Sequence, residues 1–194
     1  MKRLMIFCLV FQLVISVNAQ NVTQDKISEL RQLIIAADSI SNRLLQALPS
    51  TFDEFDKIFG YSNYDKGELS SEAFVISFLD NNVFVNYNLL YEKLVSIAAS
   101  PNSHWEADQI GEIHYSLLLC IEKNPKIIFT LLNELDRKST EQFWYFIFDG
   151  PHPSNYRVGY DSAVRFAEQK RYPYLEIIKQ SYAFHLKREQ DTHY

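Results

Sequence analysis

The feature that most constrains the fold is the spacing of apolar residues, which recur at intervals of three or four along most of the chain. Because one face of an α-helix repeats every 3.6 residues, this spacing is typical of amphipathic helices packed around an apolar core. Glycine, which weakens helices, is scarce, with five residues in 194. The pattern predicts an all-α fold, a single multihelical domain of antiparallel helix pairs, with an irregular α-solenoid as one form.

Capping residues indicate where several of these helices begin. Three pairs fit the capping-box pattern, in which a hydroxyl residue precedes Glu or Gln by three positions: Thr51 with Glu54, Ser103 with Glu106, and Ser139 with Gln142. Asn124 followed by Pro125 predicts a further start, and Gly60 an end. Together with the apolar spacing, these signals predict helices over 24–48, 52–59, 85–99, 104–121, 125–135, 161–171 and 173–188, a short segment over 70–79, and a frayed tail after Glu189.

The run from Phe143 to Phe148 contains six consecutive large apolar residues. Such a run fits a buried strand as well as a buried helix, since aromatic residues favour strands. The capping residues before it favour a helix. In either structure we expect Trp144 to lie in the core.

Residues 1–19 fit a cleavable export signal. Lys2 and Arg3 precede an almost wholly apolar run over 4–17, and Ala19 supplies a small residue at the end of the signal. The apolar run is shorter than the roughly 20 residues that a membrane-spanning helix needs. We therefore expect removal of the signal, a periplasmic or secreted helical domain over 20–194, and no stable membrane insertion of that domain.

The charge distribution argues against nucleic-acid binding. Without the two cations of the signal, the chain carries 17 basic and 24 acidic residues, and the acidic excess lies in residues 20–136. A nucleic-acid site needs clustered cations to replace phosphate counterions. We expect the basic pairs at 170–171 and 187–188 to lie on solvated helix faces. An acidic surface favours encounter with a basic protein partner.

The sequence contains no recognisable catalytic, metal or cofactor motif. A zinc signature, a nucleophile elbow, a phosphate-binding glycine loop and a dinucleotide fingerprint are all absent. His104 and His114 are too far apart to chelate one ion from a single helix, and His114 follows the apolar spacing of the core. Cys120 lies in an apolar run and is expected to be a buried hydrophobe. No cofactor, metal ligand or catalytic residue is therefore assigned.

The segment from Asp149 to Tyr160 is the best candidate for a binding site, and the alternative interpretation is a helix stop followed by a simple turn. Gly150 permits a tight turn, and prolines on both sides of His152 restrict its backbone. Tyr156, Arg157 and Tyr160 follow, and Tyr and Arg are enriched where interfaces concentrate their binding energy. The candidate binding residues are Asp149, His152, Tyr156, Arg157 and Tyr160.

These observations favour an exported, non-enzymatic helical protein that binds another protein, for example as an immunity or inhibitor protein. One alternative is an extracytoplasmic hydrolase that uses His114 or His152 beside a carboxylate. Another is a structural protein associated with the cell envelope. A cavity that gathered His114, His152 and two carboxylates would favour the hydrolase, and a dry core with an exposed aromatic patch would favour the binder.

Overall fold

The computed structural model describes residues 24–34, 42–60, 69, 87–107 and 109–192, and this part of the chain is helical without a strand. Residues 24–34 form the first helical segment. The other elements are α2 (Asn42–Ala47), α3 (Phe52–Phe59), α4 (Tyr87–Ala98), α5 (Gln109–Lys123), α6 (Pro125–Leu132), α7 (Arg137–Phe148), the 3₁₀ turn η2 (Pro153–Tyr156), α8 (Arg157–Lys170) and α9 (Leu175–Thr192). The predicted all-α, single-domain fold is confirmed.

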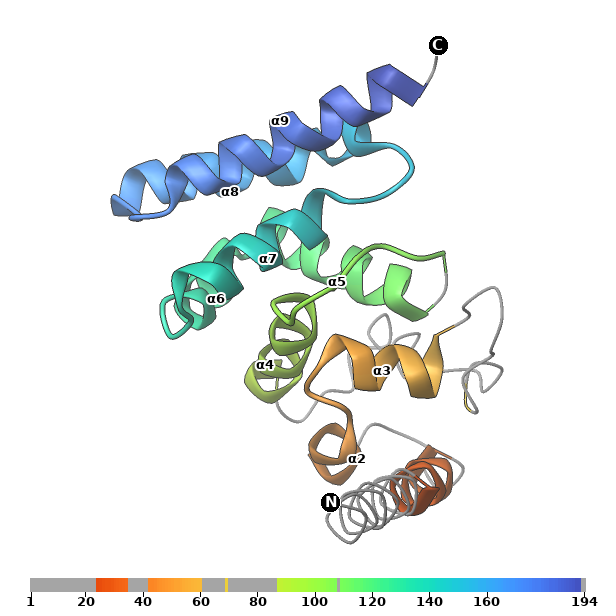
Figure 1. The fold of residues 1–194 in the computed structure, drawn as a ribbon. Helices are drawn as coiled ribbons and strands as arrows, with labels where there is room; N and C mark the ends of the chain where they lie inside the picture. Colours follow the sequence, from red (N-terminus) through yellow and green to blue (C-terminus); the bar gives the residue numbers. More distant parts are fainter. Residues whose placement is uncertain (1–23, 35–41, 61–68, 70–86, 108, 193–194) are drawn as a thin grey trace, which may run out of the picture.

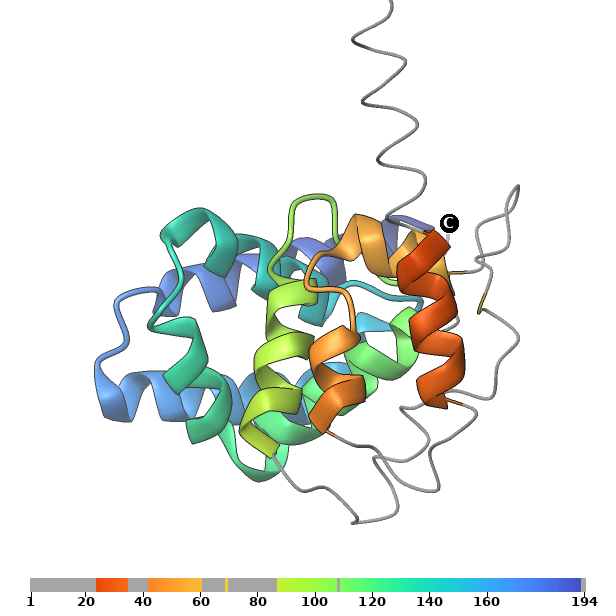
Figure 2. The same cartoon turned by 90° about the horizontal axis from the view of Figure 1, so that it is seen from below.

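The helices are arranged approximately in chain order from one end of the molecule to the other. Figure 1 shows α8 and α9 as an antiparallel pair at one end, with residues 24–34 and α2 at the opposite end. Helix α7 packs along α9, and α5 contacts α6, α7 and α8. Figure 2 shows α4 in the middle of the molecule, where it contacts α2, α3, α5, α6 and α7. The solenoid form of this arrangement stays a prediction.

Helix α7 supplies the largest side chains of the core. Phe143, Trp144, Phe146 and Phe148 are each fully buried, so the aromatic run is a helix and not a strand. Packing of α4, α5 and α9 against α7 explains why so little of this helix reaches solvent. Trp144 stacks on Phe148 and makes an edge contact with Phe143. The prediction that Trp144 lies in the core is confirmed.

Two expected helix starts are confirmed. The Thr51 side chain accepts a hydrogen bond from the Glu54 backbone at the start of α3, and Gly60 caps its end. Asn124 and Pro125 begin α6. The Thr51 hydroxyl bonds within its own helix, whereas the Asn124 side chain makes no capping hydrogen bond, so at the start of α6 the local signal is the proline in its first turn.

Two other expected capping boxes are wrong. The Ser103 hydroxyl donates to the Ala98 carbonyl and accepts from the Gln142 side chain, and α5 begins only at Gln109. Helix α7 is capped instead by Asp136, whose carboxylate accepts from the Ser139 backbone at 2.8 Å. Ser103 and Gln142, each expected to cap its own helix, thus bond to each other and link two distant parts of the chain.

The expected single helix over 24–48 is also wrong. Glu29 and Arg43 would lie about 21 Å apart along one continuous helix. Their side chains form an ion pair at 3.5 Å, so residues 24–34 and α2 cannot belong to one straight helix. Figure 2 shows residues 24–34 and α2 as two separate ribbons. An apolar period of 3.6 cannot distinguish one helix from two successive helices that share the same core. Residues 35–41 lie outside the described part of the chain. The short segment expected over 70–79 also lies outside it.

Candidate recognition surface

The connection between α7 and α8 is held at its start by Asp149. This residue caps the end of α7, and its side chain is only 8% exposed. One carboxylate oxygen accepts a hydrogen bond from the Trp105 backbone at 2.9 Å, and the other accepts from the Arg188 guanidinium of α9. Because its carboxylate is buried and bonded inside the protein, Asp149 supports the connection and does not face a partner.

Gly150 allows the turn to close against Tyr156. Its φ of 141° is one that side chains rarely adopt, and a Cβ atom there would lie 2.3 Å from the Tyr156 hydroxyl oxygen. The Tyr156 ring also packs on His114, with 4.8 Å between ring centroids. Burial, together with the charges of Asp149 and Glu189, raises the pKa of Tyr156. Tyr156 therefore fixes the turn as a neutral, half-buried side chain.

The last turns of α9 hold the middle of the connection. The Ser154 backbone and hydroxyl each donate a hydrogen bond of 3.0 Å to the Glu189 carboxylate. The same carboxylate lies 3.6 Å from the His152 ring. The expectation that the chain frays after Glu189 is therefore wrong, since α9 continues to Thr192 and Glu189 is bonded to η2.

Arg157 and Tyr160 belong to a helix and not to a loop. Helix α8 was expected near Asp161 but begins at Arg157, because the turn η2 already has helical form and leads directly into α8. The Arg157 guanidinium donates to the Asp161 carboxylate at 2.9 and 3.0 Å and lies 5.5 Å from the Tyr160 ring centroid. Tyr160 stacks on Tyr182 of α9 with 4.2 Å between centroids.

The outward side of the connection is exposed despite these anchors. We call residues 151–158 the recognition segment. Its exposed members are Pro151, His152, Ser154, Asn155, Arg157 and Val158. Val158 is 64% exposed, a high value for a large apolar side chain. The five predicted residues thus divide into Asp149 as a buried support, Tyr156 as a half-buried anchor, Tyr160 as part of the α8–α9 contact, and His152 and Arg157 as exposed groups.

Two buried histidines lie near Asp149. His114, on α5, bonds through Nε2 to the Ile147 carbonyl at 2.8 Å, as expected of a core histidine. His185, on α9, is fully buried, and its Nδ1 lies 3.6 Å from the Asp149 carboxylate. Burial lowers the pKa of each histidine to about 4. Both rings are therefore neutral at neutral pH, and Arg188 supplies the cationic partner of Asp149.

The sequence reasoning missed His185, Arg188 and Glu189. A signal for His185 was present, because Ile178, Tyr182 and His185 follow helical spacing on the buried face of α9. Arg188 was expected on a solvated face, yet it bonds to Asp149. No local pattern identified Arg188 and Glu189, since their partners lie more than 30 residues earlier in the chain.

The remaining candidate groups do not assemble a reactive centre. His104 precedes α5 and binds Glu106 at the surface, away from His114 in the core. Burial raises the pKa of Cys120 to about 11, so the thiol stays protonated, as expected of a buried hydrophobe. No group of His, Cys, Asp and Glu side chains in the described residues could hold a metal ion.

The chain was compared with protein-family models, with curated proteins and with solved structures, and none of the three comparisons gave a match. Among the helices that the structure describes, none has both the length and the apolar character needed to cross a bilayer.

Proposed function

We propose that this protein is exported and binds another protein through the recognition segment, without catalysing a reaction. The observation that carries the proposal is an exposed segment held by three contacts: the buried carboxylate of Asp149 just before it, the bonds of Ser154 to Glu189 in its middle, and the packing of Tyr156 on His114 near its end. A segment that is already ordered loses little conformational entropy on binding. This favours recognition by a fixed surface.

The exposed groups of the segment suit a protein partner. Arg157 offers a planar cation and Val158 an apolar contact, and the two are adjacent on the first turn of α8. Arginine is enriched among the residues that dominate interface energies. The acidic remainder of the chain would speed encounter with a basic partner. Inhibition of a toxic enzyme outside the cytoplasm, as an immunity protein does, is one form of this function.

Export is tested by intact-mass analysis. Protein recovered from the envelope or the medium should begin at Gln20, because the signal pattern of residues 1–19 ends in a small residue. An Ala19→Lys variant keeps the apolar run but places a large residue at the cleavage position, so it should accumulate uncleaved. Full-length wild-type protein in the cytoplasm would contradict export.

Partner binding is tested by photo-crosslinking in the native host. A photoreactive residue in place of Val158 should form an adduct with one host protein. With that protein purified, Arg157→Ala should raise the dissociation rate about tenfold, as expected when an interface loses a residue that contributes about 1.4 kcal/mol. Added salt should mainly lower the association rate.

Arg137 provides a matched control for Arg157. It is also exposed in the first turn of a helix and pairs with an acidic residue four positions later, Glu141. Arg137→Ala should leave the dissociation rate unchanged, and a photoreactive residue at Lys138 should not give the Val158 adduct. Equal effects of the two arginine substitutions would contradict recognition by this segment.

A further inference from the structure

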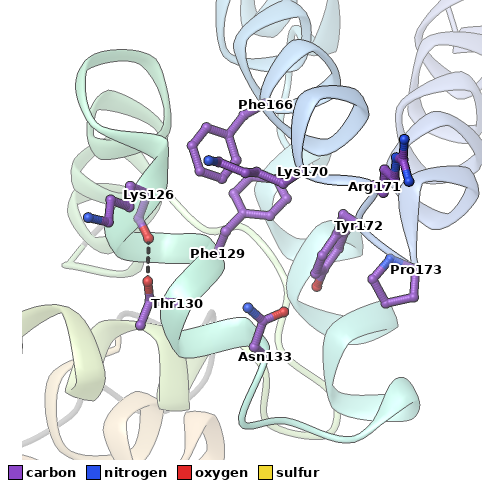
Figure 3. Close-up of a pocket in the computed structure, with 9 residues that line it drawn as sticks. All are labelled: Lys126, Phe129, Thr130, Asn133, Phe166, Lys170, Arg171, Tyr172 and Pro173. Atoms are coloured by element: carbon purple, nitrogen blue, oxygen red, sulfur yellow. Dashed lines mark hydrogen bonds between the residues drawn. The ribbon is translucent and has the colours of Figure 1, made fainter.

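A cleft of about 260 Å³ lies between α6 and the C-terminal end of α8 (Figure 3). Helix α8 has 14 residues and therefore spans about 21 Å. The cleft is thus at the opposite end of α8 from the recognition segment. Its volume is below the roughly 300–1,000 Å³ of sites for drug-sized ligands. It suits a single ring with a small substituent.

Aromatic side chains from three parts of the chain form the wall of the cleft. Phe129 of α6 lies 4.9 Å from Phe166 of α8 and 4.8 Å from Tyr172, measured between ring centroids. Phe129 and Tyr172 are almost buried, whereas Phe166 is partly exposed. Rings in this arrangement offer both faces and edges, so a further aromatic ring can pack against them in tilted geometry.

The charged residues that line the cleft are all cations: Lys126, Lys170 and Arg171. In the part of the chain that the structure describes, none of their side chains makes an ion pair. The Lys170 ammonium lies over the Phe166 ring, 6.0 Å from its centroid. In Figure 3 it extends above the aromatic wall, with Lys126 and Arg171 on either side. Three cations thus line one cleft of a chain with a formal charge of −5.

Neutral polar groups complete the lining. Thr130 donates its hydroxyl hydrogen to the Lys126 carbonyl, which leaves the oxygen free to accept a hydrogen bond. Asn133 ends α6, and its amide lies at the far side of Phe129 from Lys170 (Figure 3). An amide supplies two donors to an anionic oxygen. The cleft therefore combines an aromatic wall with donors and cations, and no carboxylate lines it.

We propose that this cleft binds an aromatic carboxylate. The ring would pack against Phe166 and Tyr172, and the carboxylate would bind Lys170, with Lys126 or Arg171 closing over it. Charge selects the anion, because a carboxylate gains charge-assisted hydrogen bonds from cations that are unpaired in the free protein. The aromatic wall selects the ring, since a small anion such as acetate would leave these apolar surfaces uncovered.

The same chemistry occurs in two sources, a free aromatic acid and the C-terminal aromatic residue of a peptide. A second cleft of about 500 Å³ lies on the other side of Lys126 and Thr130, lined also by Ile127 and Leu131. It would accommodate the apolar residues that precede a C-terminal aromatic residue. A peptide source therefore predicts tighter binding by a tripeptide than by a single aromatic acid.

The test is a titration of the full chain followed by amide chemical shifts in NMR spectra. The probes are 3-phenylpropionate, acetyl-Ala-Leu-Phe with a free C-terminal carboxylate, the same tripeptide as its C-terminal amide, and acetate. The two aromatic carboxylates should shift the amides of Asn133, Lys170 and Arg171, with Kd values of about 1 mM or below. The tripeptide with an amidated C-terminus and acetate should each bind at least about tenfold more weakly than the two aromatic carboxylates.

Variants connect this binding to the cleft. Lys170→Met keeps the apolar stem and removes the charge, so it should weaken binding of the aromatic carboxylates about tenfold. Lys187→Met, at an exposed lysine of α9 outside the cleft, is the matched control and should bind as the wild type does. Tighter binding of the tripeptide than of 3-phenylpropionate supports a peptide source, and equal binding supports a free acid.

The proposal is overturned if neither aromatic carboxylate binds, if the tripeptide amide binds as tightly as the acid, or if Lys170→Met has no effect. A failure of this ligand-binding proposal can be distinguished from a failure of the proposed protein-binding function. The Lys170→Met variant should still form the Val158 adduct, because the two surfaces lie at opposite ends of α8.

Discussion

Replacement of Trp144 by Ala is expected to lower the free energy of unfolding by about 3–5 kcal/mol, the range measured for large aromatic residues truncated in protein cores. The side chain is fully buried, and it contacts Phe129 of α6 as well as Phe143 and Phe148 of its own helix. Its removal would leave a cavity between helices that rigid neighbours can fill only in part. Urea unfolding followed by circular dichroism measures this loss.

Tyr115 provides the control for Trp144. It is a large aromatic residue on α5 that is 58% exposed. Tyr115→Ala should change the free energy of unfolding by no more than about 0.5 kcal/mol, as surface substitutions usually do. A small effect of Trp144→Ala would contradict its place in the core. A typical domain has a total stability of only about 5–15 kcal/mol, so the Trp144 variant should be partly unfolded at modest urea concentrations.

Acidification is expected to destabilise the protein between pH 6.5 and about 4. His114 and His185 have pKa values near 6.5 in the unfolded chain, and burial lowers both to about 4 in the folded protein. In this window the unfolded state binds protons that the folded state does not, so stability falls as the pH falls. Above pH 6.5 both states are neutral, and this contribution to the pH dependence vanishes. For His114 alone, the loss is about 3 kcal/mol by pH 4.

The measurement is urea unfolding at several pH values, with the imidazole proton resonances as a direct readout. His114→Gln keeps an amide that can donate to the Ile147 carbonyl, yet it cannot titrate, so the loss of stability on acidification should be clearly smaller. His104→Gln is the control, because His104 is exposed and its pKa is raised, not lowered. An unchanged pH dependence in His114→Gln, or titration of His114 near pH 6.5 in the folded protein, would contradict this prediction.

Much of the secondary structure followed from the sequence because it depends on near neighbours. The apolar period placed the end of α4 within one residue, and local signals defined α3 and the start of α6. The same period identified His114 as a core residue, and continuous apolar runs identified Trp144 and Cys120. In each case the interactions that fix the structure lie within one helix, or between one face of a helix and the apolar core. They do not depend on which other helices form that core.

The functional surfaces depended on contacts between distant parts of the chain. Hydrogen bonds from Gln142 to Ser103 and from Arg188 to Asp149 join segments that no short pattern relates. The cleft likewise needs Phe129, Phe166 and Tyr172 to meet from separate elements.

The sequence by itself thus determined that the chain forms amphipathic helices and which faces they bury. Only the tertiary structure decided that residues 24–34 and α2 are two separate helices, that α9 supports the recognition segment, and that cations gather beside an aromatic wall. The physical reason is that helical periodicity selects the buried face of each helix but leaves open its neighbour and the register between them.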